Sequence, residues 1–550
     1  MTVRRSLLLA ATLPLLVLPT TASAATAHQR AVPASSLPAA TAVHPSPRRT
    51  FDPDRATLAQ LQRALRRGDI TSVQLVDHYL ARIRRYDDQG PELHAITSIN
   101  GLARRQAAAL DRARAQKKHV GALYGIPFVV KDNYDVVGMP TTGGSVALAN
   151  NSPAKNATVV QRLLDQGAIV LAKTNMSELA ASYGRLGYSS SGGLTLNPFD
   201  LRRNASGSSS GTAVAVAARF APFGLGTDTS GSVRGPASVT GQVGIRPTLG
   251  LTSRSGVIPL SLSADTTAPV AGSVADEATV LQVIAGADPS DAATASAQTH
   301  RYATRLDTHA LRGARVGVLT SGFGGNAEVD AKVDAAIALM RRHGTTAVEV
   351  DLGSVYDNLW TDVLGPVGNA EFSSEFEHYL TSSPAGTIKT VDELIAISTS
   401  PGVEQSADPV NPARIEGYRT AQASRSLLGG AGYQRITTQL MPQLRRHVQQ
   451  VMKQQHLDAL VFPTLSCVAS PRFDRADASY SCSATDPYTS SYIASSTGLP
   501  EVTIPVGANA KHLPIGMSFL GASYTEQELL DLAASWQRVG KVHLHPRTVR

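Results

Sequence analysis

Two stretches rich in glycine and serine hold the residues best suited to chemistry in this 550-residue chain. The first reads Ser-Gly-Ser-Ser-Ser-Gly over 206–211, and the second covers 224–236 and includes Asp228 and Arg234. Small residues let the backbone approach a ligand closely and let amide groups converge on it. Similar stretches also occur as flexible connections, but apolar segments flank these two. The pattern therefore favours a site where serine hydroxyls meet a ligand.

A lysine at the end of an apolar run is a suitable partner for such serines. Residues 126–130 read Ile-Pro-Phe-Val-Val, which is typical of a strand covered on both faces, and Lys131 follows directly. A serine hydroxyl becomes a good nucleophile when a neighbouring base removes its proton. Lysine acts as a base only when neutral, and burial favours that form. The alternative is a solvated lysine at a strand end.

Helical and strand patterns alternate along the chain around these residues. Such alternation predicts an α/β fold with a largely parallel or mixed sheet. Polar segments near 285–312 and 380–412 are interpreted as surface insertions. Strands are predicted at 126–130, 168–172, 314–319 and 459–462, and helices at 56–67, after Thr71-Ser72, at 159–166 and at 213–218.

The order of these motifs resembles the amidase signature family, which includes bacterial amidases, peptide amidases, fatty acid amide hydrolase and the amidotransferase component that works on misacylated tRNA. Its pattern is a Gly/Ser loop, a small-residue helix and then Gly-x-Gly-x-Asp-x-Gly-x-Ser-hydrophobic-Arg-x-Pro. The chain meets it at Gly207, Ser208, Ser209, Gly211, Gly224, Gly226, Asp228, Ser232, Arg234 and Pro236. Further similarities, spread over 55–540, are Gly125-Ile-Pro127, Lys131-Asp-Asn133, Lys173-Thr-Asn175, Asn197-Pro198, Gly244-Ile-Arg-Pro-Thr248, Gly256-Val-Ile-Pro259, Thr497-Gly-Leu-Pro500 and Leu513-Pro-Ile-Gly516.

The resemblance implies a mixed central β-sheet flanked by helices on both faces, and a Ser-cisSer-Lys triad that hydrolyses amides through an acyl-enzyme. Ser232 would be the nucleophile and Lys131 the base. Ser208, after a cis peptide bond, would relay the proton. Asp228 and Arg234 are interpreted as structural braces. No cofactor is implied, and the expected substrate is a small-molecule or peptide amide whose binding residues stay unassigned.

The same resemblance assigns the oxyanion hole to four consecutive backbone N–H groups, those of Thr229, Ser230, Gly231 and Ser232. One such donor is typically worth about 3 kcal/mol to the transition state. Ser230 departs from the family pattern, which has Gly or Ala there, and Ser206 replaces a usual glycine. The first departure bears on substrate range, because a serine there narrows the acyl pocket or adds a hydrogen bond.

Three other interpretations of the sequence compete with a secreted serine amidase. Gly207-Ser-Ser-Ser-Gly211 matches the Gly-x-Ser-x-Gly nucleophile elbow with Ser209 as nucleophile, but that elbow follows a strand and residues 197–205 read as a loop. A tRNA-dependent amidotransferase A-type subunit would work in the cytoplasm with partner subunits. A catalytically inactive secreted binding protein would keep the fold without the chemistry.

The first residues have the pattern of an export signal. Arg4 and Arg5 precede an apolar run, and Ala22-Ser-Ala24 offers a cleavage site, so we expect a signal peptide over 1–24. The paired arginines leave Sec and twin-arginine export both open. Residues 25–50 read as a flexible leader and 51–550 as the amidase domain. The mature protein is therefore expected to be secreted.

Composition narrows the remaining options. Apolar residues make up 42% and charged residues 17% of the chain, which is typical of a globular protein. The net charge of +8 comes from scattered arginines, so neither nucleic acid nor a membrane is an expected partner. Export favours a disulfide between Cys467 and Cys482 over two free thiols. No metal motif is present, and the sequence does not predict an oligomeric state.

Overall fold

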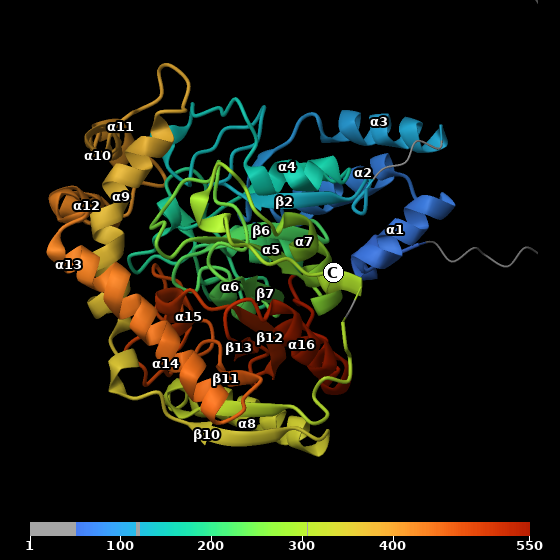
Figure 1. Ribbon diagram of the computed structural model, residues 1–550. Helices are drawn as coiled ribbons and strands as arrows, with labels where there is room; N and C mark the ends of the chain where they lie inside the picture. Colours follow the sequence, from blue (N-terminus) through green and yellow to red (C-terminus); the bar gives the residue numbers. More distant parts are fainter. Residues whose placement is uncertain (1–50, 117–120, 305, 550) are drawn as a thin grey trace, which may run out of the picture. The chain divides into compact units, whose positions relative to one another are not determined.

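A mixed sheet of 11 strands organises the computed structural model, which describes residues 51–116, 121–304 and 306–549 (Figure 1). The predicted signal peptide (1–24) and leader (25–50) lie outside the described residues. In spatial order the strands are β1 (Ile96–Ile99), β3 (Ile169–Thr174), β2 (Pro127–Lys131), β6 (Phe223–Asp228), β8 (Thr266–Ala271), β7 (Val243–Arg246), β12 (Glu501–Ala508), β13 (Pro514–Leu520), β11 (Ala459–Pro463), β9 (Arg315–Leu319) and β10 (Thr346–Val350). A separate hairpin pairs β4 (Tyr188–Ser189) with β5 (Gly193–Leu194).

The sheet has two parallel groups. β2 pairs in parallel with β3 and β6, and β9 pairs in parallel with β10 and β11. Antiparallel pairs from β6 through β8, β7, β12 and β13 to β11 join the two groups. In the first group β3 lies on one side of β2 and β6 on the other. In the second group β10 lies on one side of β9 and β11 on the other, so β2 and β9 each mark a switch point of the sheet. Ligands bind at such switch points in α/β sheets, beyond the carboxyl ends of the strands.

Helices cover both faces of the sheet, as expected. α5 (Ser210–Ala217) and α6 (Arg234–Val239) pack on one face; α4 (Thr158–Asp165), α7 (Val274–Ile284), α8 (Ala327–Arg342) and α16 (Glu526–Gly540) pack on the other. A further group, α9 to α14, lies together beside the sheet (Figure 1). The remaining helices are α1 (Leu58–Arg67), α2 (Ser72–Tyr86), α3 (Ala103–Ala115), α9 (Gly365–Leu380), α10 (Val391–Ser398), α11 (Pro401–Glu404), α12 (Pro412–Ser424), α13 (Ala431–Gln434), α14 (Met441–Gln454) and α15 (Ser491–Thr497).

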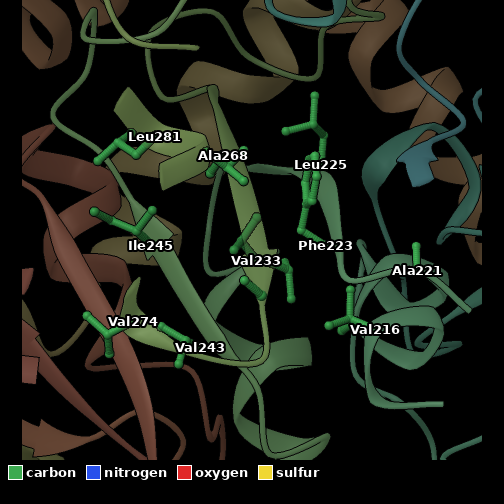
Figure 2. Close-up of a cluster of buried hydrophobic side chains, with 14 of the residues drawn as sticks. Val216, Ala221, Phe223, Leu225, Val233, Val243, Ile245, Ala268, Val274 and Leu281 are labelled. Carbon is green, nitrogen blue, oxygen red and sulfur yellow. The ribbon is translucent and has the colours of Figure 1, made fainter. Parts of the chain in front are cut away.

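Apolar runs in the sequence form the buried strands. All residues of β2, β3, β6 and β11 are buried, and these strands have the continuous apolar pattern of a sheet covered on two sides. Figure 2 shows part of this core, to which α5 contributes Val216, β6 Phe223, β7 Ile245 and α7 Leu281. The predicted strands are confirmed as β2, β3, β9 and β11, and the predicted helices as α1, α2, α4 and α5, with small shifts at their ends. Within the described ranges, no helix is both long and apolar enough to cross a membrane.

Candidate active site

Lys131 ends β2 and is fully buried. Its Nζ lies 2.8 Å from Ser208 Oγ and 2.8 Å from Thr227 Oγ1, and no carboxylate in the described part of the chain forms an ion pair with it. Burial lowers the pKa of Lys131 to about 7, although Asp228 and Asp265 oppose that shift. Lys131 is therefore neutral in a large share of the protein molecules near pH 7, as a general base requires.

The Gly207–Ser208 peptide bond is cis, as predicted. Ser208 is buried beside Lys131, and the next residue, Ser209, donates its N–H to the carbonyl of Ser232 at 3.1 Å. That bond holds the two serine segments against each other. Ser209 itself has no exposed surface, and its Oγ donates to the Thr227 carbonyl at 3.1 Å. Because no strand precedes it either, the nucleophile-elbow interpretation for Ser209 does not fit this structure.

Ser232 lies in the tight turn between β6 and α6. Gly231 has φ of +102°, a left-handed conformation that favours glycine. Its N–H donates to Asp228 Oδ1 at 3.0 Å, which differs from its predicted place in the oxyanion hole. The N–H groups of Thr229, Ser230 and Ser232 have no acceptor among the described residues.

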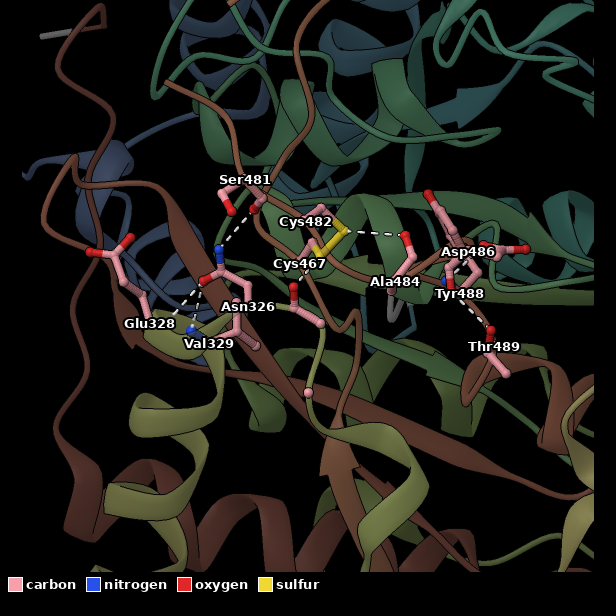
Figure 3. The surroundings of a disulfide bond; sticks show 12 residues. Asn326, Glu328, Val329, Cys467, Ser481, Cys482, Ala484, Asp486, Tyr488 and Thr489 are labelled. Atoms are coloured by element: carbon pink, nitrogen blue, oxygen red, sulfur yellow. Dashed lines mark hydrogen bonds between the residues drawn. A yellow bond between two sulfur atoms is a disulfide. The ribbon is translucent and has the colours of Figure 1, made fainter. Parts of the chain in front are cut away.

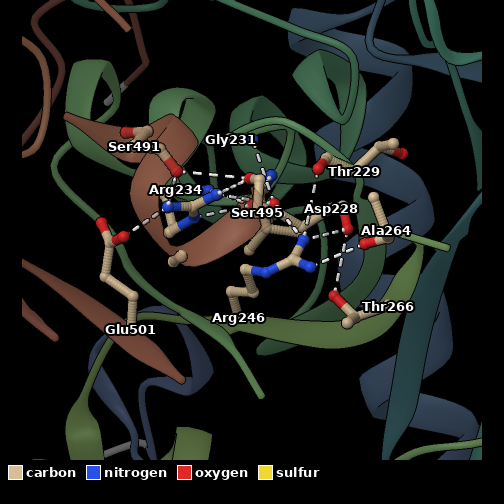
Figure 4. Close-up of polar contacts among 12 residues, drawn as sticks. Asp228, Thr229, Gly231, Arg234, Arg246, Ala264, Thr266, Ser491, Ser495 and Glu501 are labelled. Carbon is tan, nitrogen blue, oxygen red and sulfur yellow. Dashed lines mark hydrogen bonds and ion pairs between the residues drawn. The ribbon is translucent and has the colours of Figure 1, made fainter. Parts of the chain in front are cut away.

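A buried network of charges holds this turn (Figure 4). Arg234 contacts both oxygens of Asp228, at 3.0 and 2.9 Å, and also pairs with Glu501. Arg246 reaches Asp228 Oδ1 at 3.0 Å. Burial alone would raise the pKa of Asp228, but the two arginines outweigh it and hold that pKa well below its usual range. The ionised Asp228 in turn accepts hydrogen bonds from the Gly231 and Val233 amides, so the network braces the turn as predicted.

A cavity of about 730 Å³ opens in front of the serines. Gly207, Thr229, Ser230 and Ser232 all line it. Its walls come from the loop at 180–186, from 260–264 and from the segment 360–421. Mostly apolar or aromatic side chains face the cavity, among them Tyr183, Leu186, Leu260, Trp360, Leu364 and Phe372.

The sequence interpretation missed three residues beside the predicted triad. Thr227 contacts Lys131, and its position between Gly226 and Asp228 of the motif could have indicated this. Asp265 accepts a hydrogen bond from Thr229 Oγ1 at 2.5 Å and carries no local sequence signal. Tyr488 lines the cavity, and its hydroxyl is hydrogen-bonded to Ser206 Oγ.

The predicted disulfide is present, and it links Cys467 with Cys482. It lies in the long segment between β11 and α15 (Figure 3). In the parts of the chain that the structure describes, no group of three or more His, Cys, Asp or Glu side chains is arranged to hold a metal ion.

Known proteins share this sequence and fold over most of the chain. The Amidase family profile matches residues 74–530. The A-type subunit of the glutamyl-tRNA(Gln) amidotransferase of Deinococcus deserti is 34% identical over 499 residues, which is 89% of this chain and 97% of that protein.

Solved structures show the same similarity. The peptide amidase of Stenotrophomonas maltophilia is 34% identical, with a TM-score of 0.80 over 90% of this chain and 99% of its own. An amidase-family protein of Bacillus anthracis is 28% identical, with a TM-score of 0.77 over 90% of this chain and 92% of its own. The chain therefore belongs to the amidase family of enzymes, which act on amide C–N bonds.

Proposed function

We propose that this protein is a secreted amidase that hydrolyses extended amides, such as peptide amides, through an acyl-enzyme on Ser232. The observation that carries the proposal is the position of Lys131. Its buried amine donates to two hydroxyl groups, and one of them is Ser208 Oγ at 2.8 Å. Ser232 lines the adjacent cavity, where a substrate carbonyl has room to bind.

The proposed reaction starts with neutral Lys131. Lys131 takes the proton of Ser208, which takes the proton of Ser232, and Ser232 Oγ attacks the carbonyl carbon. Collapse of the tetrahedral intermediate breaks the C–N bond, and Ser208 delivers the proton to the leaving amine. Water then attacks the acyl-enzyme by the same relay and regenerates Ser232.

The oxyanion needs N–H donors that are not already bonded to another acceptor. Gly231 N–H is directed to Asp228, so we assign the oxyanion hole to the N–H groups of Thr229, Ser230 and Ser232. These amides are held in place by the buried Asp228–Arg234 pair. Donors fixed before the reaction stabilise the developing charge without a reorganisation cost.

The cavity supports an acyl group larger than a simple aliphatic one. A volume of about 730 Å³ is in the range that buries drug-sized ligands, and apolar walls favour bulky side chains. The sequence and fold similarity to a peptide amidase supports the same class of substrate. The export pattern at 1–24 and the Cys467–Cys482 disulfide support a site of action outside the cytoplasm.

A second candidate is a component of a tRNA-dependent amidotransferase, favoured by the 34% identity with the Deinococcus deserti protein. Such a component would need partner subunits and would work inside the cell. N-terminal sequencing of the protein recovered separately from the culture medium and from the cells separates the two. A mature chain that begins after Ala24 supports the secreted amidase, whereas an intact Met1 on intracellular protein supports the amidotransferase.

The direct test of activity is ammonia release from acetyl-Phe-NH₂ and from longer peptide amides. We expect release by the mature protein, loss of release in Ser232→Ala and retention in Ser354→Ala, an exposed serine outside the cavity. Equal rates in the parent and in Ser232→Ala would contradict the assignment.

A further inference from the structure

A second crevice lies at the other switch point of the sheet. It has a volume of about 620 Å³, and it is lined by Ser321–Gly325, which follow β9, and by Ser466, which follows β11. The chain goes from β9 to β10 on one side and later returns to β11 on the other. Lys131 occupies the corresponding place at the carboxyl end of β2, next to β6. The second crevice therefore has the location of a ligand site but no assigned ligand.

Two aromatic residues connect this crevice with the candidate active site. Trp360 and Tyr492 line both cavities, and their ring centroids are 5.6 Å apart. Trp360 is 49% exposed, which leaves much of its indole ring open to a ligand. A substrate in the active-site cavity that extended past this pair would enter the crevice.

The crevice is acidic in a basic protein. Asp357 and Asp486 line it, and no Lys, Arg or His is among the described residues that do so, although the whole chain carries a net charge of +8. Asp357 is exposed and forms no ion pair within the described ranges. Asp486 accepts hydrogen bonds from Tyr488 N–H at 2.9 Å and from the Tyr492 hydroxyl at 2.6 Å, so it is fixed beside the shared aromatic wall.

The disulfide holds the wall that carries Asp486 (Figure 3). Cys467 follows the lining residue Ser466, and Cys482 precedes the lining residue Ser483. Ser483 N–H also donates to the Gly325 carbonyl at 2.8 Å, which ties this wall to the loop after β9. The crevice is thus built from segments that are fixed to one another.

We propose that the acidic crevice binds a cationic group, an ammonium or guanidinium, of a peptide amide whose carboxamide lies at Ser232. This inference rests on the proposed function. Carboxylates attract such a cation, and the face of Trp360 offers a further favourable surface for it. An extended peptide advances about 3.3 Å per residue, so the position of the cation along the peptide decides whether it reaches the crevice. The crevice makes the enzyme selective for peptide amides with a positive charge upstream of the amide.

Binding to the Ser232→Ala protein tests this selectivity without turnover. The probes are acetylated tetrapeptide amides ending in Phe-NH₂, with Arg at the first, second or third position and Gln as its neutral replacement. A Gln peptide with a free N-terminus separates an α-ammonium from a side-chain cation. Calorimetry should show that one cationic peptide binds about tenfold tighter than its neutral counterpart, as expected for one charge-assisted contact.

Asp357→Asn, added to Ser232→Ala, should remove most of this preference, because both carboxylate oxygens of Asp486 already accept hydrogen bonds. Asp334→Asn is the matched control, because Asp334 is an exposed carboxylate on α8 outside the crevice, and it should keep the preference. Equal binding of all cationic and neutral probes would overturn the proposal, as would a preference that Asp357→Asn leaves undiminished. Hydrolysis of acetyl-Phe-NH₂ by the parent protein tests the proposed function separately, since that amide carries no cation.

Discussion

Lys131 Nζ and Ser208 Oγ lie 2.8 Å apart in a position without solvent exposure. Lys173, on the neighbouring strand β3, is equally buried but pairs with Asp132 at 3.1 Å and also donates to the Tyr134 carbonyl at 2.7 Å. Lys173 therefore has a partner that stabilises its charge, whereas Lys131 donates to the hydroxyls of Ser208 and Thr227. This difference in neighbours favours Lys131 over Lys173 as the base in the proposed mechanism.

The first prediction concerns the pH dependence of activity. Lys131 must be neutral to accept a proton, and its pKa is about 7. We expect kcat/KM to fall about tenfold per pH unit below pH 7 and to level off above it. Lys131→Arg should be inactive throughout, because a guanidinium does not lose its proton in this range. A flat profile between pH 5 and 8 would exclude Lys131 as the base.

A second prediction concerns stability. The pKa of Lys131 is lowered from 10.5 in the unfolded chain to about 7 in the folded one, so between these values the unfolded state binds a proton that the folded state does not. The buried Lys131 therefore lowers the free energy of unfolding by its full amount below pH 7, and this cost declines as pH rises from 7 toward 10.5. Lys131→Met removes the cost. The gain in thermal midpoint of Lys131→Met over the parent should therefore be larger at pH 6 than at pH 9.5. A gain that is larger at pH 9.5 would contradict burial of a neutral amine.

The third prediction concerns the buried charge network that holds the turn around Ser232. Arg234→Met leaves Glu501 without its cationic partner and Asp228 with Arg246 as its remaining ion pair, and breaking such a buried pair costs about 3–5 kcal/mol. Arg202→Met is the matched control, because Arg202 pairs with Asp200 at the surface and should leave the urea unfolding curve almost unchanged. Similar curves for both variants would show that the network does not stabilise the fold.

How far the sequence predicts this site depends on how local each signal is. The strand that ends at Lys131 follows from five apolar residues in a row, and Ser208 and Ser232 lie in two nearby Gly/Ser-rich stretches, 206–211 and 224–236. The cavity walls were not predicted, because residues of α9 and α12 meet the loop at 260–264 only after folding. Glu371 of α9 illustrates this, since it accepts a hydrogen bond from the Ser263 N–H at 3.2 Å across 108 residues of sequence.

Ser206 illustrates the same limit. Its departure from the family pattern is visible in the sequence, but its partner Tyr488 is 282 residues away. The ring of Tyr488 covers the turn so closely that a Cβ on Gly235 would lie 2.7 Å from its Cε1. The hydrogen bond from the Gly231 N–H to Asp228, which bears on the predicted oxyanion hole, is likewise revealed only by the folded geometry.

The fourth prediction separates two properties of Ser206, which are its hydrogen bond to Tyr488 and its left-handed backbone with φ of +62°. Ser206→Ala loses the bond to Tyr488 and keeps the strained backbone, so it should cost about 1–2 kcal/mol of unfolding free energy. Ser206→Gly also loses the bond but relaxes the backbone, so it should cost less than the alanine variant. In a Tyr488→Phe background the alanine substitution should cost little. A glycine variant less stable than the alanine variant would refute this account.

The central claim is that Ser232 is the nucleophile, activated through Ser208 and Lys131. Labelling of the mature protein with a fluorophosphonate, followed by mass spectrometry of its peptides, tests this most directly. We predict one adduct, on Ser232, formed at least on the order of 10²-fold more slowly in folded Ser208→Ala and Lys131→Met variants. An adduct on another serine, or undiminished labelling in both variants, would contradict the account.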